Sequence, residues 1–340
     1  MQPFEYIEAQ SIEEAVALLA AHPEDAQIIA GGTDLLSEIK DGIATPRRLI
    51  SLAGIPALHA ISDTGHGLAI GAMATIAQVA EHPAVGSNYT ALQEAAAGLA
   101  TPQIRNTGTL GGNLNQRPRC WYYRHPLTIC LKKGGDQCHA LAGASKYLCV
   151  TGGDRCYIVH PSDTAVALVA LDASIEVAGP SGVKALLLED FFTGPGRDIA
   201  RENVLEPGEL VTRVLLPGPK SGVEPAADGK GNHMMPSNSV YLKAREREAG
   251  DFALVSVAAA ITLEGTTIVG ASVVLGGVAP VPYRAREVEE YLLGNDASRV
   301  DPVHAGNLAL PDASPMAGNA YKVILAQNLV KRAVERLLAR

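Results

Sequence analysis

The sequence predicts an α+β protein of two domains, and three observations support this prediction. Short β-branched segments alternate with segments of helical periodicity in the first third of the 340-residue chain. Residues 218–237 are rich in Gly, Pro, Lys and Asp and have little hydrophobic periodicity, which is typical of a linker. Beyond this linker the pattern indicates a hairpin and amphipathic helices. We therefore expect a first domain at 1–217 and a smaller α+β domain at 238–340.

Capping residues and apolar runs predict the elements of the first domain. Ser11 and Glu14 form a capping box ahead of the apolar run 12–19, and Pro23 ends this helix. Further helices are expected over 35–39, 76–81, 89–100 and 164–170, with Thr75 as the cap of the second of these. Strands are expected over 27–30, 48–52, 68–70, 174–178 and 210–216.

The second domain is predicted from one hairpin and two helices. The apolar segments 253–263 and 267–275 flank Glu264-Gly265-Thr266, and a glycine in so short a connection favours a hairpin. Amphipathic helices are expected over 284–293 and 319–339.

Composition and charge argue against nucleic-acid and membrane partners. The net charge of −8 does not suit a surface that neutralises phosphates, and no stretch reaches the roughly 18 apolar residues that a membrane-spanning helix needs. The first 15 residues include acidic side chains and show no export signal, so disulfides are a poor default for the cysteines. We expect a cytoplasmic protein, or a periplasmic one if it is exported folded together with a signal-bearing partner.

Two glycine-rich segments are candidates for binding phosphate. Ala30-Gly31-Gly32-Thr33-Asp34-Leu35 follows a predicted strand, and Thr109-Leu110-Gly111-Gly112-Asn113 lies at the start of the cysteine-rich part of the chain. Glycines allow consecutive backbone N–H groups to converge on an anion, although a plain tight turn is the simpler interpretation of either segment alone. Neither matches the G-x-G-x-x-G or P-loop pattern. The pair therefore predicts a dinucleotide held by a fold other than the Rossmann fold.

All five cysteines of the chain lie within a span of 37 residues. They lack the close C-x2-C pairs of zinc sites and of ferredoxins, so their spacing does not name a metal. Ordering about 40 residues with few aliphatic side chains costs roughly tens of kcal/mol, which indicates that something staples the loop at 114–160. Free buried cysteines are the alternative. The cysteines, the possible histidine ligands and the aromatic residues that would shield a cluster are Cys120, Cys130, Cys138, Cys149, Cys156, His125, His139, His160, Trp121, Tyr122 and Tyr123.

Together these segments resemble a known family. The two glycine segments, the run from His160-Pro161-Ser162-Asp163 to Leu171-Asp172-Ala173, and Phe252 to Ala258 are similar to the FAD-binding medium subunit of the xanthine dehydrogenase/aldehyde oxidase family of molybdenum hydroxylases. The resemblance covers nearly the whole chain. It implies an FAD-binding domain of the vanillyl-alcohol oxidase type, built from two α/β subdomains, followed by a C-terminal domain like that of CO dehydrogenase flavoproteins.

The resemblance also implies which residues contact FAD. The family's pyrophosphate and ribityl contacts fall on the two glycine segments, and its flavin contacts fall on Asp163 and Lys243, for which a helix N-cap and a surface lysine are the simpler interpretations. The implied cofactor-binding residues are Ala30, Gly31, Gly32, Thr33, Asp34, Leu35, Thr109, Gly111, Gly112, Asn113, Asp163 and Lys243.

The cysteine insertion resembles two branches whose flavin subunit carries a [4Fe–4S] cluster, namely bacterial aldehyde oxidoreductase and 4-hydroxybenzoyl-CoA reductase. The first branch implies Cys120, Cys130, Cys138 and Cys156 as ligands and Cys149 as a bystander, with the basic turn at Lys132-Lys133 offsetting the cluster's charge. In the second branch the last interval is shorter, which would make Cys149 a ligand instead of Cys156.

The implied function is electron transfer by one subunit of a molybdenum-dependent aldehyde oxidoreductase. The implied partners are a molybdopterin-binding large subunit, a small subunit with [2Fe–2S] clusters and an external electron acceptor, and no catalytic acid or nucleophile is assigned to this chain. A 4-hydroxybenzoyl-CoA reductase-like or xanthine dehydrogenase-like enzyme is the nearest alternative. A zinc-stabilised interaction module and a self-contained flavin oxidase are alternatives from other classes.

Overall fold

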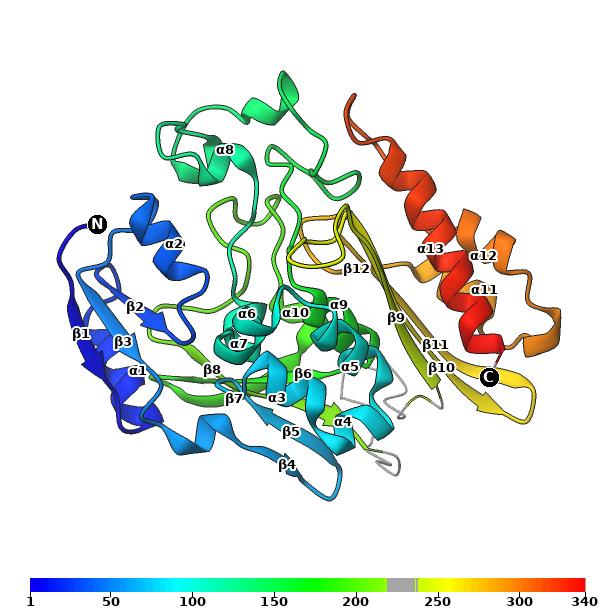
Figure 1. Ribbon diagram of the computed structural model, residues 1–340, viewed down its shortest axis with the longest axis horizontal. Coiled ribbons are helices and arrows are strands. Elements are labelled where there is room, and N and C mark those ends of the chain that lie inside the picture. The colour runs from blue at the N-terminus through cyan, green and yellow to red at the C-terminus, as the bar shows by residue number, and fades with distance from the viewer. Residues whose placement is uncertain (219–235, 237, 340) are drawn as a thin grey trace.

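The computed structural model describes residues 1–218, 236 and 238–339 (Figure 1). The predicted linker at 218–237 therefore lies outside the described residues except for Gly218 and Pro236. The described chain forms three sheets, with strand orders β1-β3-β2, β4-β5-β8-β6-β7 and β12-β11-β10-β9. Figure 1 shows the first sheet at the left, the second along the bottom and the third at the right.

The first sheet is small and parallel. Its strands are β1 (Glu5–Glu8), β2 (Ala26–Ile29) and β3 (Arg48–Ser51), with β3 in the middle. Helix α1 (Ile12–Ala21) begins as predicted at Ser11, whose Oγ accepts a hydrogen bond from the N–H of Glu14 at 3.1 Å. Helix α2 (Leu35–Lys40) directly follows the turn after β2. This turn is the first glycine segment, so the sheet places it at the carboxyl end of a strand.

The second sheet is antiparallel and carries a layer of helices. Its strands are β4 (Ile61–Asp63), β5 (Gly67–Gly71), β6 (Ser174–Gly179), β7 (Gly182–Leu187) and β8 (Leu210–Pro217). The short helices of this part are η1 (Pro56–His59), α3 (Ile76–Glu81), α4 (Pro83–Asn88), α5 (Thr90–Ala97), α6 (Pro102–Thr107), α7 (Leu110–Leu114) and α10 (Leu188–Phe191).

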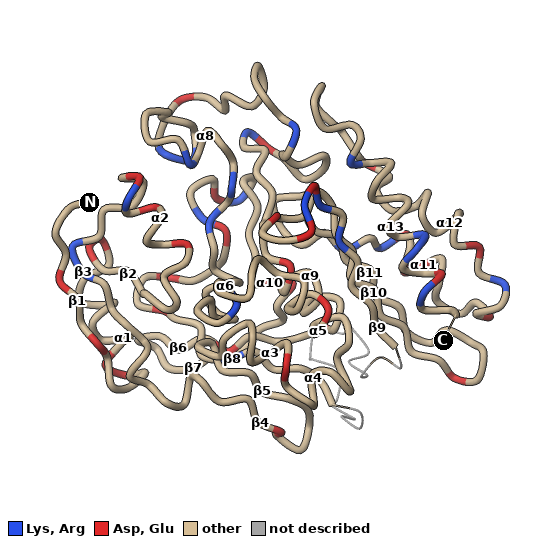
Figure 2. Tube along the Cα trace, in the orientation of Figure 1, with Lys and Arg blue, Asp and Glu red and all other residues tan. Residues whose placement is uncertain are grey.

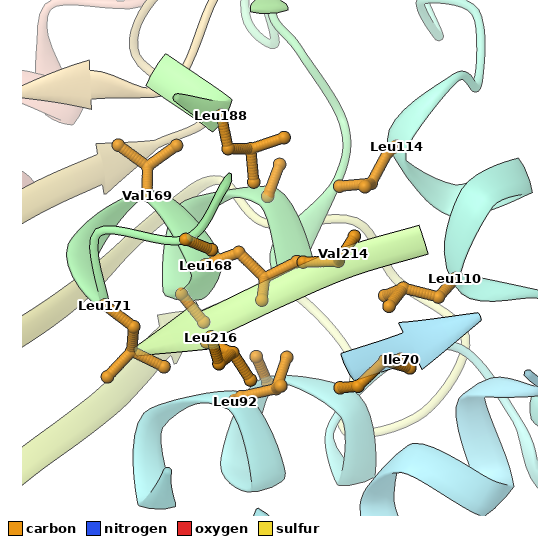
Figure 3. Close-up of a cluster of buried hydrophobic side chains, with 14 of the residues drawn as sticks. Ile70, Leu92, Leu110, Leu114, Leu168, Val169, Leu171, Leu188, Val214 and Leu216 are labelled. Carbon is orange, nitrogen blue, oxygen red and sulfur yellow. The ribbon is translucent and has the colours of Figure 1, made fainter. Parts of the chain in front are cut away.

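Helix α9 (Asp163–Ala170) is the centre of the core, and all eight of its residues are buried. It packs against α5 on one side and against β10 and β11 of the third sheet on another. Figure 3 shows Leu168 beside Val214 of β8, with Leu92 of α5 and Ile70 of β5 nearby. Residues 165–170 are apolar on every side of the helix, so α9 has to be covered all round.

The third sheet is antiparallel and forms the C-terminal part. Its strands are β9 (Asn238–Ala244), β10 (Val255–Glu264), β11 (Thr267–Gly276) and β12 (Tyr283–Arg284), and β10 and β11 form the predicted hairpin. Helices α11 (Arg286–Leu292), η4 (Ala297–Arg299), α12 (Pro302–Asn307) and α13 (Tyr321–Leu338) lie on the side of this sheet away from α9 (Figure 1).

The cysteine-rich segment forms the top of the molecule in Figure 1 and has little regular structure. Between α7 and α9 its elements are α8 (Trp121–Arg124) and the single turns η2 (Leu131–Lys133) and η3 (His139–Leu141). Among the described residues no helix is both long and apolar enough to cross a bilayer.

Candidate cofactor sites

The first glycine segment leaves a row of backbone donors free. The N–H groups of residues 31–35 donate to no acceptor among the described residues. Gly32 has a φ of +69°, and a side chain on Gly31 would collide with the carbonyl oxygen of Thr107. Glycines at these two positions therefore let the turn pack against α6 while five consecutive N–H groups stay available for an anion.

The second glycine segment differs from the prediction, because it opens a helix. Thr109 caps α7 through its Oγ1, which accepts from the N–H of Gly112 at 3.2 Å. The N–H of Leu110 donates to Ala74, that of Gly111 to Ala72, and that of Asn113 to Thr109. The protein itself thus uses four of the N–H groups of this segment, and its contact with FAD stays a prediction.

Asn113 joins the second glycine segment to the start of α9. Its Oδ1 accepts hydrogen bonds from Ser162 Oγ and from Thr164 Oγ1, each at 2.6 Å. Ser162 Oγ in turn accepts from the N–H of Ala165 at 3.0 Å and caps α9. The structure thus brings two of the predicted flavin-contact segments together, about 50 residues apart in sequence, through side chains.

Asp163 and Lys243 form a buried ion pair. Lys243 Nζ lies 2.6 Å from Asp163 Oδ2, and the two side chains are 6% and 4% exposed. Tyr241 OH donates to Asp163 Oδ1 at 2.6 Å, and burial together with the charge of Asp163 holds the pKa of Tyr241 well above its usual value. Ser162, and not Asp163, is the N-cap of α9, and the side chain of Lys243 is buried. The simpler interpretations of Asp163 as a helix N-cap and of Lys243 as a surface lysine therefore do not hold.

A cavity of about 290 Å³ opens beside this ion pair. Its walls come from the segments 119–122, 144–148 and 159–163 and from the C-terminal residues 246–256 and 276–277, and they include Trp121, Tyr147 and Phe252. Asp163 lies in its wall, whereas residues 30–35 and 109–113 do not. Aromatic walls with a few charged groups are typical of a site for a planar cofactor ring.

Asp34 has a role that the sequence did not predict. Its Oδ1 accepts from Arg119 Nη1 at 2.6 Å and from Arg124 Nη2 at 2.8 Å, and its Oδ2 accepts from the N–H of Arg117 at 2.7 Å. Nearby Glu38 is 5% exposed and accepts from Tyr123 OH at 2.7 Å. Figure 2 shows acidic and basic residues gathered between α2 and α8. The first glycine segment is thus tied to the start of the cysteine-rich segment.

Arg119 links this network to the large cavity. It lines the cavity wall, and its guanidinium carbon lies 4.8 Å from the ring centroid of Phe252. Burial lowers the pKa of Arg119 and outweighs the neighbouring carboxylate of Asp34. The sequence signal that could have found this residue is the basic run Arg117-Pro118-Arg119 shortly after the second glycine segment.

Four of the five cysteines line one small cavity. Cys120, Cys130, Cys138 and Cys156 share it with Lys132, Tyr122, Tyr123 and Ile158, and no described histidine is in its wall. Lys132 is held there by the buried carboxylate of Glu202, which also lies 3.0 Å from Arg117 Nε. Lys133, the second residue of the basic turn, instead donates to the carbonyl of His125.

Cys149 lies outside that cavity. It is 2% exposed, and its carbonyl oxygen accepts from Asn319 Nδ2 at 2.9 Å. Burial raises the pKa of the Cys149 thiol to about 12, although the nearby charge of Lys322 opposes this shift. Burial also raises the pKa of Cys156, to about 11.

Among the described residues, no group of three or more His, Cys, Asp or Glu side chains is placed to hold a metal ion. The three candidate histidines have other surroundings. His125 Nδ1 bonds Thr128, His139 packs against the ring of Tyr122, and His160 stacks edge-on with Phe192 at 4.6 Å. Burial lowers the pKa of His160 to about 4, so its ring is neutral at pH 7.

Comparisons with known proteins agree with this architecture. A family model described as the FAD binding domain in molybdopterin dehydrogenase matches residues 2–219, and a model of the CO dehydrogenase flavoprotein C-terminal domain matches residues 240–337. The aldehyde oxidoreductase FAD-binding subunit PaoB of Escherichia coli is 36% identical over 100% of this chain and 98% of its own length. The carbon monoxide dehydrogenase medium chain of Afipia carboxidovorans is 30% identical over 99% of this chain and 97% of its own length.

Solved structures give the same assignment. Reconstituted CO dehydrogenase from Oligotropha carboxidovorans has a TM-score of 0.76 at 27% identity, covering all of both chains. Quinoline 2-oxidoreductase from Pseudomonas putida 86 has a TM-score of 0.72 at 25% identity, covering 99% of this chain and 98% of the other. The fold class predicted from the sequence is therefore confirmed. The chain belongs to the FAD-binding subunits of the molybdenum hydroxylase family and is an FAD-dependent oxidoreductase subunit.

Proposed function

We propose that this chain is the FAD- and [4Fe–4S]-containing electron-transfer subunit of a heteromeric molybdenum-dependent aldehyde oxidoreductase. Electrons from a molybdenum centre would arrive through iron–sulfur clusters, reach FAD and pass to an external acceptor. The partners would be a molybdopterin-binding large subunit and a small subunit with [2Fe–2S] clusters. The observation that carries this proposal is the gathering of four cysteines around one cavity beside a second, aromatic-walled cavity.

FAD, when bound, supplies the redox chemistry, and the residues of this chain place and tune it. The free N–H groups of residues 31–35 support a diphosphate site there, because consecutive N–H groups without an acceptor in the protein can bind an anion. The cavity of about 290 Å³ beside the Asp163–Lys243 ion pair supports a position for the flavin ring there. Arg119 lies between the two sites, bonded to Asp34 and lining the cavity, and its charge suits the diphosphate end of the cofactor.

The donor set of the small cavity supports a four-iron cluster. Four thiols are the usual ligands of such a cluster, and Lys132, paired with Glu202, lines the same cavity. The position of Cys149 outside the cavity supports Cys156 as the fourth ligand.

The aldehyde class of substrate is proposed from the relationship to PaoB. A 4-hydroxybenzoyl-CoA reductase-like or xanthine dehydrogenase-like enzyme remains the second candidate, because the features described above belong to electron transfer and contain no substrate site. We propose a cytoplasmic location, with periplasmic co-export as the alternative. Fractionation of cells that express the complete complex distinguishes the two compartments.

Cofactor content tests the proposal. The full chain, purified anaerobically, is expected to contain noncovalent FAD and about four irons with matching sulfide. A colourless protein that contains zinc would contradict the proposal and support a zinc-stabilised module. Oxidation of aldehydes by the chain alone would instead support a self-contained oxidase. Co-purification with a molybdopterin subunit and a [2Fe–2S] subunit tests the partners.

A further inference from the structure

The mouth of the large cavity lies between two segments that are far apart in sequence. One is 144–148 of the cysteine-rich segment, and the other is the connection 245–254 between β9 and β10. Asp163 in the cavity wall is 3% exposed, whereas the side chains of Lys146 and Glu246 are 49% and 43% exposed. Lys146 and Glu246 therefore mark the mouth, where the cavity meets solvent.

Glu246 joins the two sides of this mouth. One oxygen of its carboxylate forms an ion pair with Lys146 Nζ, and the other accepts a hydrogen bond from Tyr147 OH at 2.8 Å. The ring of Tyr147 packs edge-on against Trp121 with the ring centroids 5.4 Å apart, and Lys146 Nζ lies 5.2 Å from the Tyr147 centroid. A single carboxylate thus holds an aromatic pair that lines the cavity.

From these contacts we propose that Glu246 is a latch across the mouth of the large cavity. While Glu246 holds Lys146 and Tyr147, the mouth is closed on that side. When these contacts part, the rings of Tyr147 and Trp121 turn away and the mouth widens. The latch therefore sets the rate at which a ligand enters and leaves the cavity. This inference rests on the proposed function only in taking FAD as that ligand.

The contacts of the latch are weak, whereas the two segments that it joins are anchored elsewhere. Exposed ion pairs contribute little to stability, so the bonds of Glu246 break and re-form readily. The carbonyl of Lys146 accepts from Tyr321 OH at 3.0 Å, which ties 144–148 to α13. Arg245 Nη1 donates to the carbonyl of Gly98 at 3.0 Å, which ties the connection after β9 to the end of α5. Opening is thus a local change of side chains.

The fluorescence of Trp121 tests the latch, because Trp121 is the only tryptophan in the sequence and packs against Tyr147. The full chain is compared with Glu246→Gln, which removes the charge and keeps the size of the side chain. The matched control is Glu248→Gln. It removes the same charge from the same connection, and within the described part of the chain the Glu248 side chain has no hydrogen bond or ion pair.

We expect the rapid component of the Trp121 anisotropy decay to grow about twofold in Glu246→Gln, because the stacked ring of Tyr147 loses its support. The wild-type chain should show the same change in about 0.5 M NaCl, which screens an exposed ion pair. An unchanged decay in Glu246→Gln, or an equal change in Glu248→Gln, would overturn the latch.

Exchange of FAD distinguishes a latch from a direct contact with the ligand. A latch changes the association and dissociation rates by the same factor and leaves Kd unchanged, whereas loss of a direct contact mainly speeds dissociation. In stopped-flow mixing with FAD, we expect both rates to rise about threefold in Glu246→Gln. Glu248→Gln should keep the wild-type rates, and it controls for the loss of a charge that repels the anionic diphosphate.

A raised Kd with an unchanged association rate in Glu246→Gln would overturn the latch, because Glu246 would then be a contact of the ligand. A wild-type chain that binds no FAD would instead refute the proposed function, and the fluorescence of Trp121 would still decide whether Glu246 is a latch.

Discussion

The ion-pair network of Asp34 permits a quantitative prediction, tested by Asp34→Asn. The carboxylate accepts from Arg119 and Arg124 through one oxygen and from the N–H of Arg117 through the other. Asparagine has a single acceptor oxygen, so in either orientation its NH2 group faces a donor. The substitution also leaves two arginines without their shared counter-charge.

The size of the effect follows from burial. Breaking a fully buried ion pair costs about 3 to 5 kcal/mol, and losing one hydrogen bond to a charged group costs about 1.5 to 3 kcal/mol. The side chains of Asp34, Arg119 and Arg124 are 16%, 28% and 15% exposed, so solvent offsets part of the loss. We therefore expect the free energy of unfolding to fall by about 2 to 3 kcal/mol.

Urea unfolding of the full chain measures this loss, and limited proteolysis within 120–156 and FAD retention locate it. The matched control is Asp25→Asn, whose carboxylate lies 3.5 Å from Arg48 and is 42% exposed. Such a surface pair contributes at most about 1 kcal/mol. The reasoning is refuted if Asp34→Asn destabilises the protein no more than this control does and leaves the cysteine-rich segment equally resistant to protease.

Three further predictions concern single side chains. Gly111→Val is expected to lower the free energy of unfolding, because a Cβ at Gly111 would lie 2.8 Å from that of Ala72, and any loss of FAD should follow from this instability. A normal urea midpoint together with loss of FAD would contradict this. Cys149→Ser should keep its iron while Cys156→Ser loses it, and the reverse result would exchange their roles. Burial lowers the pKa of Lys322 to about 8, so between pH 8 and the ordinary value of 10.5 the unfolded chain binds the extra proton and stability rises with pH. Lys322→Met should remove a rise of about 3 kcal/mol, measured by urea unfolding at both pH values, and an unchanged rise would show that other groups cause it.

Local patterns predicted most elements of the fold. Ser11 and Thr75 each cap a helix where expected, and the hairpin around Gly265 is formed. Each of these signals involves only a few neighbouring residues, so it can be recognised from the sequence alone. The apolar run over 164–170 likewise predicted a helix, although its covering by β10 and β11 depends on distant strands.

The parts that were missed depend on contacts between distant residues. The segment 109–113 was expected to be a loop, yet it begins helix α7, and the N–H groups of Leu110 and Gly111 donate to Ala74 and Ala72, about 40 residues earlier in the chain. The FAD contact expected of Asp34 stays a prediction, but its bonds to arginines 85 and 90 residues further along were not foreseen. Local propensity does not reveal such partners.

The predicted domain boundaries and the FAD and metal ligands stay predictions. The free N–H groups at 31–35 and the four cysteines around one cavity are observations that sequence spacing alone did not supply.

The most direct test of the central claim is the Mössbauer spectrum of the full chain, purified with FAD after growth on isotopically enriched iron. If Cys120, Cys130, Cys138 and Cys156 hold one cluster, the spectrum should consist of the signal of a single [4Fe–4S] species, in a ratio of about one cluster to one flavin. A spectrum with only mononuclear iron, or with no iron bound while FAD is retained, would contradict the claim.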